Sequence, residues 1–445
     1  VFMKKNEVVL LSVLLLILML GMLGIGLFGK GKKQTESTPV STPAATGENT
    51  AEPTPAPTPE KEYDTVDEVP DKVMNALKKE AETAMLSTRD TYDSLDKGTA
   101  LNVVLSQDSV AQIVYTLAEN GYSAIDYFGN MDMQNPQPLI DFGNAVNAGQ
   151  DAEAAYYVVH TDGSIHANNL VYNNGVGSVI TISVEWRDGN PRIYSAGQFS
   201  LSEIKYTEKG WLICNRYTGS FDKDGKLGTN PHTFIRLVPY ADDKRALSER
   251  YLGSSAYAEN NLFTCTWSSN NFGELDFNCL YPILYGQYYG TEQLISSNIN
   301  ALTGYATVSD TNMHIVPYEQ FERVIGHFFD IKDETIRAMA DNSSSYGGYF
   351  ILGAQPGFYT STTVHLPEPE ITDYWYNSDG TLTMKIDAVY PWYGTDCAFT
   401  HELTVEETKN GFIYVSNYVY ESADNIFPDL ALKREREAEI VTLGE

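Results

Sequence analysis

The stretch EAAYYVVHTDGSIHANNLVY, Glu153 to Tyr172, holds two runs of strand-forming residues on either side of Asp162-Gly163. β-Branched and aromatic residues favour strands, and an Asp-Gly pair favours the tight turn of a hairpin. Downstream, apolar and polar residues alternate from Ile180 to Trp186, which predicts a strand with one buried face. A turn is expected at Asp188-Gly189, followed by two further strands, Ile193 to Tyr206 and Trp211 to Tyr217. These elements together predict an antiparallel meander.

The residues before this meander have the spacing of helices. Apolar side chains recur three or four positions apart from Asp71 to Leu95, which predicts an amphipathic helix. A second helix is expected over Gln107 to Asn120, where Ser106 can cap the first turn and Gly121 can follow the last. A third helix is expected after Pro138. The first half of the chain is therefore predicted to place helices before a sheet.

The second half of the chain repeats this order. Its expected helices and strands are Asp242 to Leu252, Pro317 to Phe329, Asp333 to Ala340, Tyr349 to Leu352, Thr362 to Leu366, Leu382 to Ala388, Ala398 to Glu406 and Phe412 to Tyr420. In addition, Thr207 to Tyr217 aligns without a gap on Thr408 to Tyr418. The sequence thus predicts two similar α+β domains, each with helices packed on a curved antiparallel sheet. The order of elements is similar to cone-shaped NTF2-like or cystatin-like folds, an analogy of fold and not of function.

Five longer sequence segments of the second half are distinctive. They are FGELDF (Phe272 to Phe277), LYPILYG (Leu280 to Gly286), VPYEQFERVIGHFFDIKDETIR (Val316 to Arg337), NSDGTLTMKIDAVYP (Asn377 to Pro391) and FTHELTVEETKNGFIYVSNYV (Phe399 to Val419). From Lys205 to Ser422 the chain resembles an uncharacterised family of extracytoplasmic proteins of Gram-positive anaerobes, tethered by a lipid or a membrane span. The resemblance implies a surface location and no activity, because the family has no assigned catalytic residues. This chain departs from the lipid-tethered members because no cysteine precedes Cys214.

An apolar segment near the N-terminus, Val8 to Phe28, has 21 residues without a charge or a proline. A helix of this length spans roughly 31 Å at about 1.5 Å per residue, which matches a bilayer core. A cleaved signal peptide is the alternative, but its apolar core is normally about 7–15 residues and ends in small residues. Gly24-Ile25-Gly26 fits that pattern poorly. The segment therefore favours a single-pass anchor in the cell membrane.

The region after this anchor, Gln34 to Glu60, has seven Thr, six Pro, two Ser and no aromatic residue. Such a composition cannot bury a core, so an extended stem is expected, which suits an extracellular C-terminal domain. Lysines on both sides of the anchor leave its orientation open by charge alone. The predicted organisation is a tail and anchor (1–33), the stem (34–62), a first domain (63–240), a second domain (241–422) and a charged tail (423–445).

The formal net charge of the chain is −29. Residues 1–60 contain five Lys and five Asp or Glu, so the whole excess lies in residues 61–445. Nucleic acids and anionic lipid surfaces are bound through Lys and Arg patches, and an acidic body repels them. Nucleic-acid binding is therefore excluded as the function.

Several short patterns lack the context that their chemistry needs. Gly24 to Gly29 matches a dinucleotide fingerprint but lies at the end of the apolar segment, with no strand before it. Asp222 to Gly225 hints at a calcium loop, yet the twelfth position is Thr233 instead of Glu. Ser94 and Ser202 each precede a lysine as in S-x-x-K, without the companion motifs. Asp396, His401 and Glu402 can approach one another at a strand start, but polar residues so close in sequence more often simply face solvent.

The histidines and cysteines raise the question of metals and disulfides. A two-residue turn at Asp162-Gly163 pairs Val159 with His166 and points the rings of His160 and His166 to opposite faces, so they cannot share an ion. A longer turn would change this. Four cysteines allow three pairings or buried thiols, and Cys265 with Cys279 can close a local loop; the four are Cys214, Cys265, Cys279 and Cys397. No metal, cofactor or catalytic residue is assigned.

Aromatic residues are the strongest indication of a binding surface. The chain has 30 Tyr and 5 Trp, and the candidate surface comprises Tyr374, Trp375, Tyr376, Trp392 and Tyr393. Tyr and Trp offer wide contact area with a polar group and are enriched at interfaces, although strands also bury aromatics in cores. We expect a non-catalytic surface protein that binds an envelope glycan, a peptide or a surface protein. The alternative is an envelope hydrolase with an Asp/Glu/His pocket.

Overall fold

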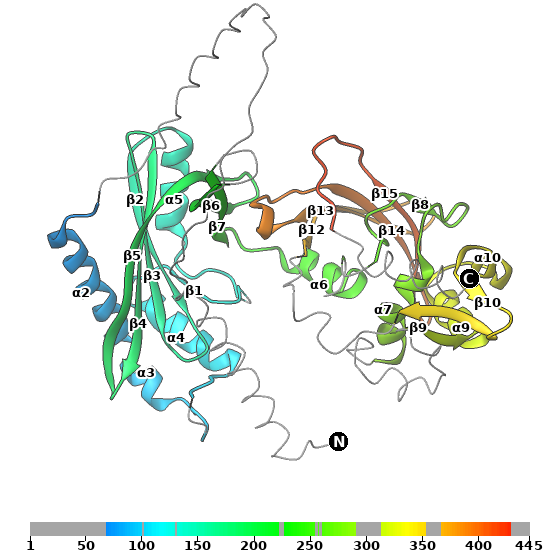
Figure 1. The fold of residues 1–445 in the computed structure, drawn as a ribbon, viewed down its shortest axis with the longest axis horizontal. Coiled ribbons are helices and arrows are strands. Elements are labelled where there is room, and N and C mark those ends of the chain that lie inside the picture. Colours follow the sequence, from blue (N-terminus) through cyan, green and yellow to red (C-terminus); the bar gives the residue numbers. More distant parts are fainter. Residues whose placement is uncertain are drawn as a thin grey trace, which may run out of the picture. The chain divides into compact units, whose positions relative to one another are not determined.

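The computed structural model describes residues 68–99, 102–129, 131–221, 227–253, 257, 260–290, 313–352 and 366–428. These residues form eight α-helices, a curled seven-stranded sheet and two further antiparallel sheets, which confirms the predicted α+β class (Figure 1). The chain divides into two units, Val1–Glu62 and Tyr63–Glu445. The expected anchor and stem lie outside the described residues. Within the described part, no helix is long and apolar enough to cross a membrane.

Four helices precede or interrupt the start of the seven-stranded sheet: α2 (Asp71–Ser87), α3 (Arg89–Ser94), α4 (Gln107–Glu119) and α5 (Gln137–Asn147). The helix expected from Asp71 to Leu95 is divided at Thr88, whose buried hydroxyl donates to the Met85 carbonyl oxygen at 2.8 Å. A side chain that bonds back to the preceding turn competes with continued helix. The predicted cap is confirmed, because the Ser109 amide donates to Oγ of Ser106 at 3.2 Å.

The seven-stranded sheet follows chain order: β1 (Ala124–Asp126), β2 (Ala152–Val159), β3 (Ile165–Asn173), β4 (Val176–Arg187), β5 (Asn190–Tyr206), β6 (Trp211–Phe221) and β7 (Leu227–Arg236). Only the β1–β2 pair is parallel, so the predicted meander is confirmed from β2 onward. The turn at Asp188-Gly189 is also as expected, with φ of 51° and 72°. β7 was not predicted, because a glycine and Pro231 interrupt its strand pattern.

The turn between β2 and β3 differs from the prediction. Val159 pairs with Ile165, which leaves five residues in the connection instead of two. Oδ1 of Asp162 accepts bonds from the amide of Ser164 at 2.9 Å and from its hydroxyl at 2.6 Å. These bonds from the aspartate widen the loop, and the register of β3 against β2 shifts by one residue, so that Val158 pairs with His166.

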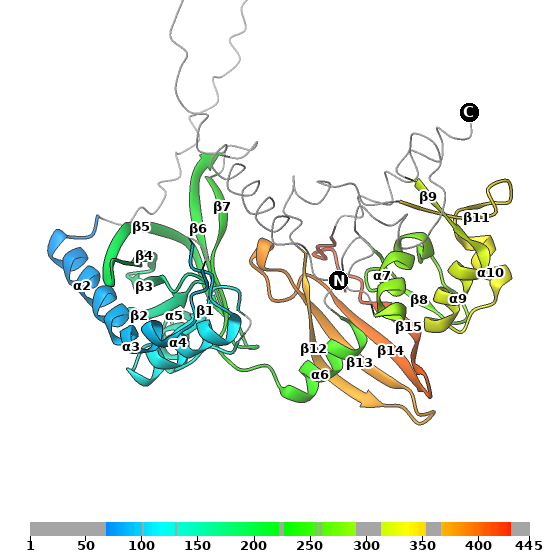
Figure 2. The same cartoon turned by 90° about the horizontal axis from the view of Figure 1, so that it is seen from below.

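The sheet is strongly curled (Figure 2), and one hydrogen bond across it is evidence of the curvature. The hydroxyl of Tyr156 on β2 lies 2.7 Å from that of Thr233 on β7. In a flat sheet five strand spacings would separate β2 from β7 by about 24 Å. Register shifts in β4, β5 and β6 contribute to the bend, since bulges increase local twist. We call the face that carries Tyr156 and Thr233 the inner face.

Each face of the curled sheet has its own apolar core. On the outer face, α2 and α4 bury side chains such as Met85 and Val114 against Tyr157 and Ile182. On the inner face, α5 packs Phe142 together with neighbours on the strands. Alternation along each strand therefore sends residues to two helix-covered layers, which explains why β4 is more buried than the half-buried strand expected.

The second half of the chain forms the other two sheets. Its helices are α6 (Asp242–Tyr251), α7 (Phe277–Tyr289), α9 (Tyr318–Phe328) and α10 (Asp333–Met339). The five-stranded sheet has the order β12 (Glu368–Tyr376), β13 (Leu382–Val389), β14 (Thr400–Thr408), β15 (Gly411–Val419) and β8 (Trp267–Ser268). The three-stranded sheet has the order β10 (Asn342–Ser343), β11 (Gly348–Leu352) and β9 (Met313–Pro317). One aromatic-rich core joins these helices and strands.

Two expectations for this half differ from the structure. α7 was not predicted, because Pro282 and Gly286 obscure its helical pattern; its start is fixed by Asp276, whose Oδ1 accepts from two backbone amides. The strand expected at Thr362 to Leu366 lies almost entirely outside the described residues. The two aligned segments, Thr207 to Tyr217 and Thr408 to Tyr418, each contain a hairpin turn and most of its second strand.

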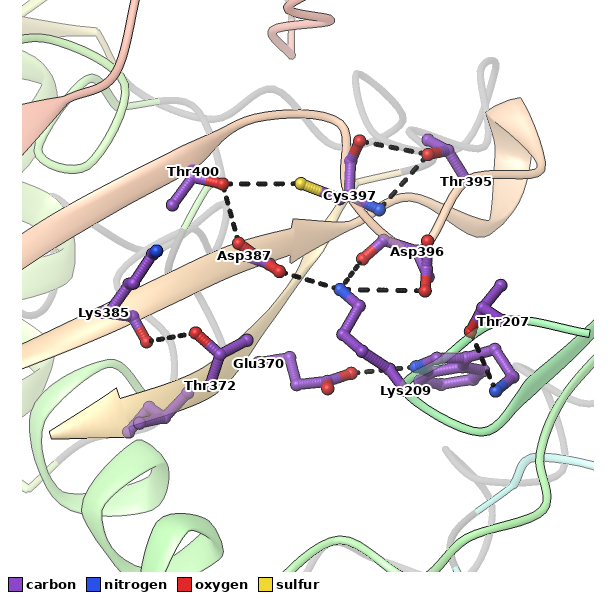
Figure 3. A network of polar contacts seen from close by, with 12 residues as sticks. Thr207, Lys209, Glu370, Thr372, Lys385, Asp387, Thr395, Asp396, Cys397 and Thr400 are labelled. Atoms are coloured by element: carbon purple, nitrogen blue, oxygen red, sulfur yellow. Dashed lines mark hydrogen bonds and ion pairs between the residues drawn. The ribbon is translucent and has the colours of Figure 1, made fainter.

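A lysine in the β5–β6 turn connects the two halves of the described chain. Lys209 donates to Oδ2 of Asp387 at 2.9 Å and to the backbone oxygen of Asp396, and it also lies 3.9 Å from the Asp396 carboxylate (Figure 3). Thr400 donates to the other oxygen of Asp387 at 2.7 Å. One partly buried cation therefore meets two carboxylates, of which that of Asp387 is also held by Thr400.

The bond that demonstrates the curl gives a prediction about stability. Replacing Tyr156→Phe removes one buried hydroxyl and leaves the ring, so we expect the free energy of unfolding to fall by about 1–1.5 kcal/mol. Urea unfolding of the full chain measures this. Tyr115→Phe is the matched control, because that tyrosine is 49% exposed on α4 and should change stability by less than about 0.5 kcal/mol. Equal effects of the two changes would contradict the role of the bond.

Candidate functional site

A cavity of about 290 Å³ opens on the inner face of the curled sheet. Its walls come from β1 and the loop after it, and from β2, β3, β4 and β7. The polar lining consists of Asp126, Tyr156, His166, Asn168, Thr181, His232 and Thr233. This volume is near the lower end of the roughly 300–1,000 Å³ of small-molecule sites, so it suits one ring or a short segment of a larger ligand.

A continuous hydrogen-bond chain crosses this cavity from β2 to β3 by way of β7 and β4. Oγ1 of Thr181 donates to Oδ1 of Asn168 at 2.8 Å, so its contact with Nε2 of His232, at 3.3 Å, requires that Nε2 carries the proton. Nδ1 of His232 then accepts from Thr233 at 3.1 Å. Thr233 in turn accepts from Tyr156. The chain is thus complete with a neutral imidazole.

The hydrogen-bond chain ends at Asn168, whose side-chain amide has a donor that a ligand can use. Asn168 is 5% exposed, and its Oδ1 is used by Thr181. Within the described part of the molecule its Nδ2 meets no acceptor, and it is not one of the buried atoms without a partner, so it is accessible to solvent. Asn168 lines the cavity, so this Nδ2 is a donor that a ligand oxygen can use. The bulge between Cys214 and Asn215 leaves His232 unpaired on β7, which lets both His232 and Thr233 reach the site.

A row of aromatic rings, exposed at Tyr127, Phe128 and Tyr194, borders the cavity. Tyr127 and Phe128 are 57% and 68% exposed, and their ring centroids are 5.2 Å apart. The row continues from Tyr127 to His160 at 4.4 Å and from His160 to His166 at 4.1 Å. Nε2 of His166 lies 3.0 Å from the hydroxyl of Tyr194. We call Phe128, Tyr127, His160, His166 and Tyr194 the aromatic row; it offers ring faces and edges beside a polar pocket.

The expectation that His160 and His166 point apart is wrong. The five-residue turn places His160 in the loop and His166 opposite Val158, so the two rings touch. Nε2 of His160 is buried with no hydrogen-bond partner among the described residues. A metal does not follow from this pair, since in the described part no group of three or more His, Cys, Asp or Glu residues could hold an ion.

The cavity is close to electrically neutral. Burial, with a smaller effect of neighbouring His160, lowers the pKa of His166 to about 4. Burial also lowers the pKa of His232 to about 4, with the Arg216 charge acting in the same direction. Neither Lys nor Arg is among the lining residues, and Asp126 is their only carboxylate. A mainly neutral polar lining without a cation favours uncharged hydroxyl and amide groups over anionic ligands.

The five aromatic residues predicted as a surface do not form one patch. The register pairs Trp375 with Thr383 and Glu368 with Val389, so the end of β12 near Trp375 is about 23 Å from the end where β13 leads to Trp392 and Tyr393. Tyr374 and Tyr376 face the opposite side of β12 from Trp375, as alternation predicts. Tyr374 donates to Asp243 of α6 at 2.8 Å, whereas Trp392 and Tyr393 are 52% and 55% exposed.

The cluster considered at Asp396, His401 and Glu402 does not assemble. His401 is fully buried between the hydroxyl of Tyr257, at 3.0 Å, and Oδ1 of Asn417, at 2.7 Å. Glu402, next along the strand, accepts instead from Tyr420 at 2.6 Å. Asp396 faces Lys209.

The other weighed patterns also have ordinary structural roles. Ser202 lies on β5 and donates to the backbone oxygen of Asn215 at 3.1 Å, while Ser94 ends a helix. All four cysteines lie within the described residues and none is in a disulfide, so the loop considered between Cys265 and Cys279 is not closed. The pattern at Asp222 to Gly225 lies outside the described residues.

A comparison with models of protein families identifies the family of the chain. One model matches residues 74–434. The chain belongs to DUF6070, a family of unknown function. The DUF6070 match begins well before Lys205, where the recognised resemblance began, and so includes the curled sheet, the cavity and the aromatic row. Neither a curated protein nor a solved structure matches the chain.

Buried neutral histidines make stability depend on pH. Burial lowers the pKa of His401 to about 4, against about 6.5 in the unfolded chain, so the unfolded state takes up its proton first. His401 should therefore stabilise the fold fully above pH 6.5, and this contribution should be lost as the pH falls toward 4. The full change for this residue is about 3 kcal/mol.

Denaturant unfolding of the full chain across this range measures the loss, and histidine ring NMR identifies the group. We expect the ring signals of His401, His166 and His232 to stay constant from pH 8 to pH 5.5. A His401 ring that titrates near pH 6.5 in the folded protein would contradict its burial as a neutral group.

Proposed function

We propose that this protein is a membrane-anchored surface binding protein outside the cytoplasm, whose inner-face cavity binds an uncharged, hydroxyl-rich ligand such as a sugar unit of an envelope glycan. The observation that carries the proposal is the unused amide donor of Asn168, placed at the end of a neutral hydrogen-bond chain and beside exposed aromatic rings. Sugars present hydroxyls at their edges and apolar C–H faces, which suit planar amides and aromatic rings respectively.

The charges of the molecule support the same class of ligand. With a net charge of −29 and neither Lys nor Arg in the cavity, a phosphorylated or polyanionic ligand would meet repulsion and find no counter-ion. The aromatic row is wider than a single ring, so a chain of several sugar units has more surface available than a free monosaccharide. A peptide or surface protein, the other partners considered, would be expected to use backbone or charged groups that this lining does not provide.

Hydrolysis is the less favoured alternative for this cavity. Glycoside hydrolases normally place two carboxyl groups about 5–9.5 Å apart across the bond that they cleave. Among the described residues that line the cavity there is one carboxylate, Asp126, and its Oδ1 already accepts from the Met131 amide at 3.2 Å. The histidines are held by hydroxyl groups and not by a carboxylate that would orient a general base. Binding without catalysis fits this arrangement better.

The location rests on the sequence. Val8 to Phe28 has the length of a single membrane span, and the Thr- and Pro-rich stem after it can carry the acidic body away from the bilayer. The resemblance to anchored extracytoplasmic proteins of Gram-positive anaerobes points the same way. On this proposal the cavity lies on the envelope side of the membrane.

We also propose that the two halves are related domains of the cone-shaped NTF2-like or cystatin-like kind. Two features support this: helices precede an antiparallel meander in both halves, and the two aligned segments occupy corresponding hairpins. In the first half the curled sheet also has α5 and a cavity on its inner face. A cone of this type supplies a pocket without specifying its ligand.

The binding proposal predicts the effect of removing one exposed ring. Tyr127→Ala in the full chain, purified in detergent, should weaken binding of an uncharged oligosaccharide about tenfold, because a central aromatic contact contributes about 1.4 kcal/mol or more. Calorimetric titration with soluble chito-, cello- and malto-oligosaccharides measures this. Tyr115→Ala is the matched control, an exposed tyrosine on α4 outside the cavity, and should leave affinity unchanged.

Cosedimentation with purified cell-wall material separates the two candidate surfaces. Retention weakened by Tyr127→Ala but not by Trp375→Ala or Trp392→Ala would support the cavity. The reverse pattern would move the site to the second-half aromatics, and no retention by any form would overturn glycan binding.

A further inference from the structure

A second cavity, of about 310 Å³, adjoins the first. Ile125, Phe128, Gly129, Phe234 and Ile235 line both, so the two cavities share a wall. The second differs in its chemistry. Besides aromatic rings it contains five charged side chains, which come from the loop after β1, from β7, from α6 and from β12: Asp132, Arg236, Arg245, Glu368 and Glu370.

Four of these five charges pair with one another. Nη1 of Arg236 lies 2.7 Å from Oε2 of Glu370, which also accepts from the indole of Trp211 at 2.9 Å. Nη2 of Arg245 lies 3.2 Å from Oδ1 of Asp132. Both guanidinium groups are therefore already committed to a carboxylate. The lining holds three carboxylates against two guanidinium groups, so its net charge disfavours an anionic ligand.

Glu368 is the one of these five charged side chains that is not in an ion pair. Among the described residues its carboxylate meets neither a cation nor a hydrogen-bond donor. It is the first residue of β12, two positions before Glu370, so alternation puts both carboxylates on the same side of the strand. Glu368 is exposed at the cavity mouth, although nearby protein atoms remove part of its water and so raise the pKa of its carboxyl. Its carboxylate is therefore accessible to a cationic ligand.

The walls of the cavity suit a cation that carries an apolar chain. The ring of Tyr240 already makes cation–π contacts with Arg236 at 5.0 Å and Arg245 at 5.8 Å, and each of these arginines also has a carboxylate partner. The unpaired charge of the cavity is therefore that of Glu368. Phe128 and Phe234 supply apolar surface for methylene groups. At longer range the acidic body attracts cations.

We propose that this second cavity binds an organic ammonium group, such as a primary amine on a short alkyl chain, with the Glu368 carboxylate as its counter-ion. The inference does not require that the first cavity binds sugar. If both hold, the shared wall at Phe128 allows one ligand with a hydroxyl-rich ring and an amine to occupy both cavities.

The test compares three probes of one shape: pentylammonium, 1-pentanol and pentanoate. Each is titrated into the full chain in detergent and followed by NMR of the protein. We expect saturable binding of pentylammonium, at least tenfold weaker binding of pentanol, and none of pentanoate. Glu368→Gln should weaken pentylammonium binding at least tenfold. Glu406→Gln, an exposed carboxylate on β14 outside the cavity, is the matched control and should bind as the unaltered chain does.

The thermal midpoint of Glu368→Gln shows whether a loss of binding is specific. Because Glu368 is exposed and has no partner among the described residues, the change breaks no contact and the midpoint should stay the same. Equal pentylammonium binding by Glu368→Gln, equal affinity for pentanol, or a preference for pentanoate would each overturn the ammonium site. Loss of oligosaccharide binding in Tyr127→Ala with unchanged pentylammonium binding would show that the two sites are separate; failure of oligosaccharide binding altogether would sink only the proposed function.

Discussion

The curl of the seven-stranded sheet is the constraint on which the candidate site depends. It brings β7 opposite β2 and β4, which converts one face of an ordinary meander into the wall of a cavity. The 2.7 Å contact between Tyr156 and Thr233 spans that space, and both residues are almost fully buried. Since buried hydroxyls need partners, the bond and the curvature stabilise each other. The remaining inner-face residues then follow from strand alternation, which places His166, Asn168 and Thr181 beside one another.

Two neighbouring cavities with different electrostatics emerge from this arrangement. The first is lined mainly by neutral groups, with Asp126 as the one carboxylate of the lining. A chain of hydrogen bonds among the neutral groups runs in one direction to Asn168, whose Nδ2 meets no acceptor among the described residues. The second contains two ion pairs and one carboxylate without a counter-ion. The two linings favour different functional groups of a ligand. Because the cavities share a wall at Phe128, these two groups would bind close to each other. A ligand that combines them would be recognised more specifically than either part alone.

The sequence predicted most elements but not the site. Periodicity located α4, β4 and β13 well, because each keeps one apolar stripe against a core. It missed β7, where Pro231 and a glycine hide the strand, and β7 is the strand that closes the cavity. The Asp162-Gly163 pair alone suggested a tight turn, but hydrogen bonds to the Asp162 side chain accompany a longer one. As a result, the rings of His160 and His166 contact each other instead of facing apart. The clusters of aromatic residues in the sequence pointed to Trp375 and Trp392. Tyr127 and Phe128 are an isolated pair in the sequence, and only the curvature of the sheet shows that they lie beside a cavity.

The most direct test of the central claim is a titration of the full chain, carrying isotope-labelled histidine, with an uncharged oligosaccharide. The account predicts that the ring signals of His166 and His232 shift together and saturate, because both line the cavity. The signal of His401, buried in the second half, should stay in place and serve as an internal reference. Saturable binding that leaves His166 and His232 unchanged would contradict the account.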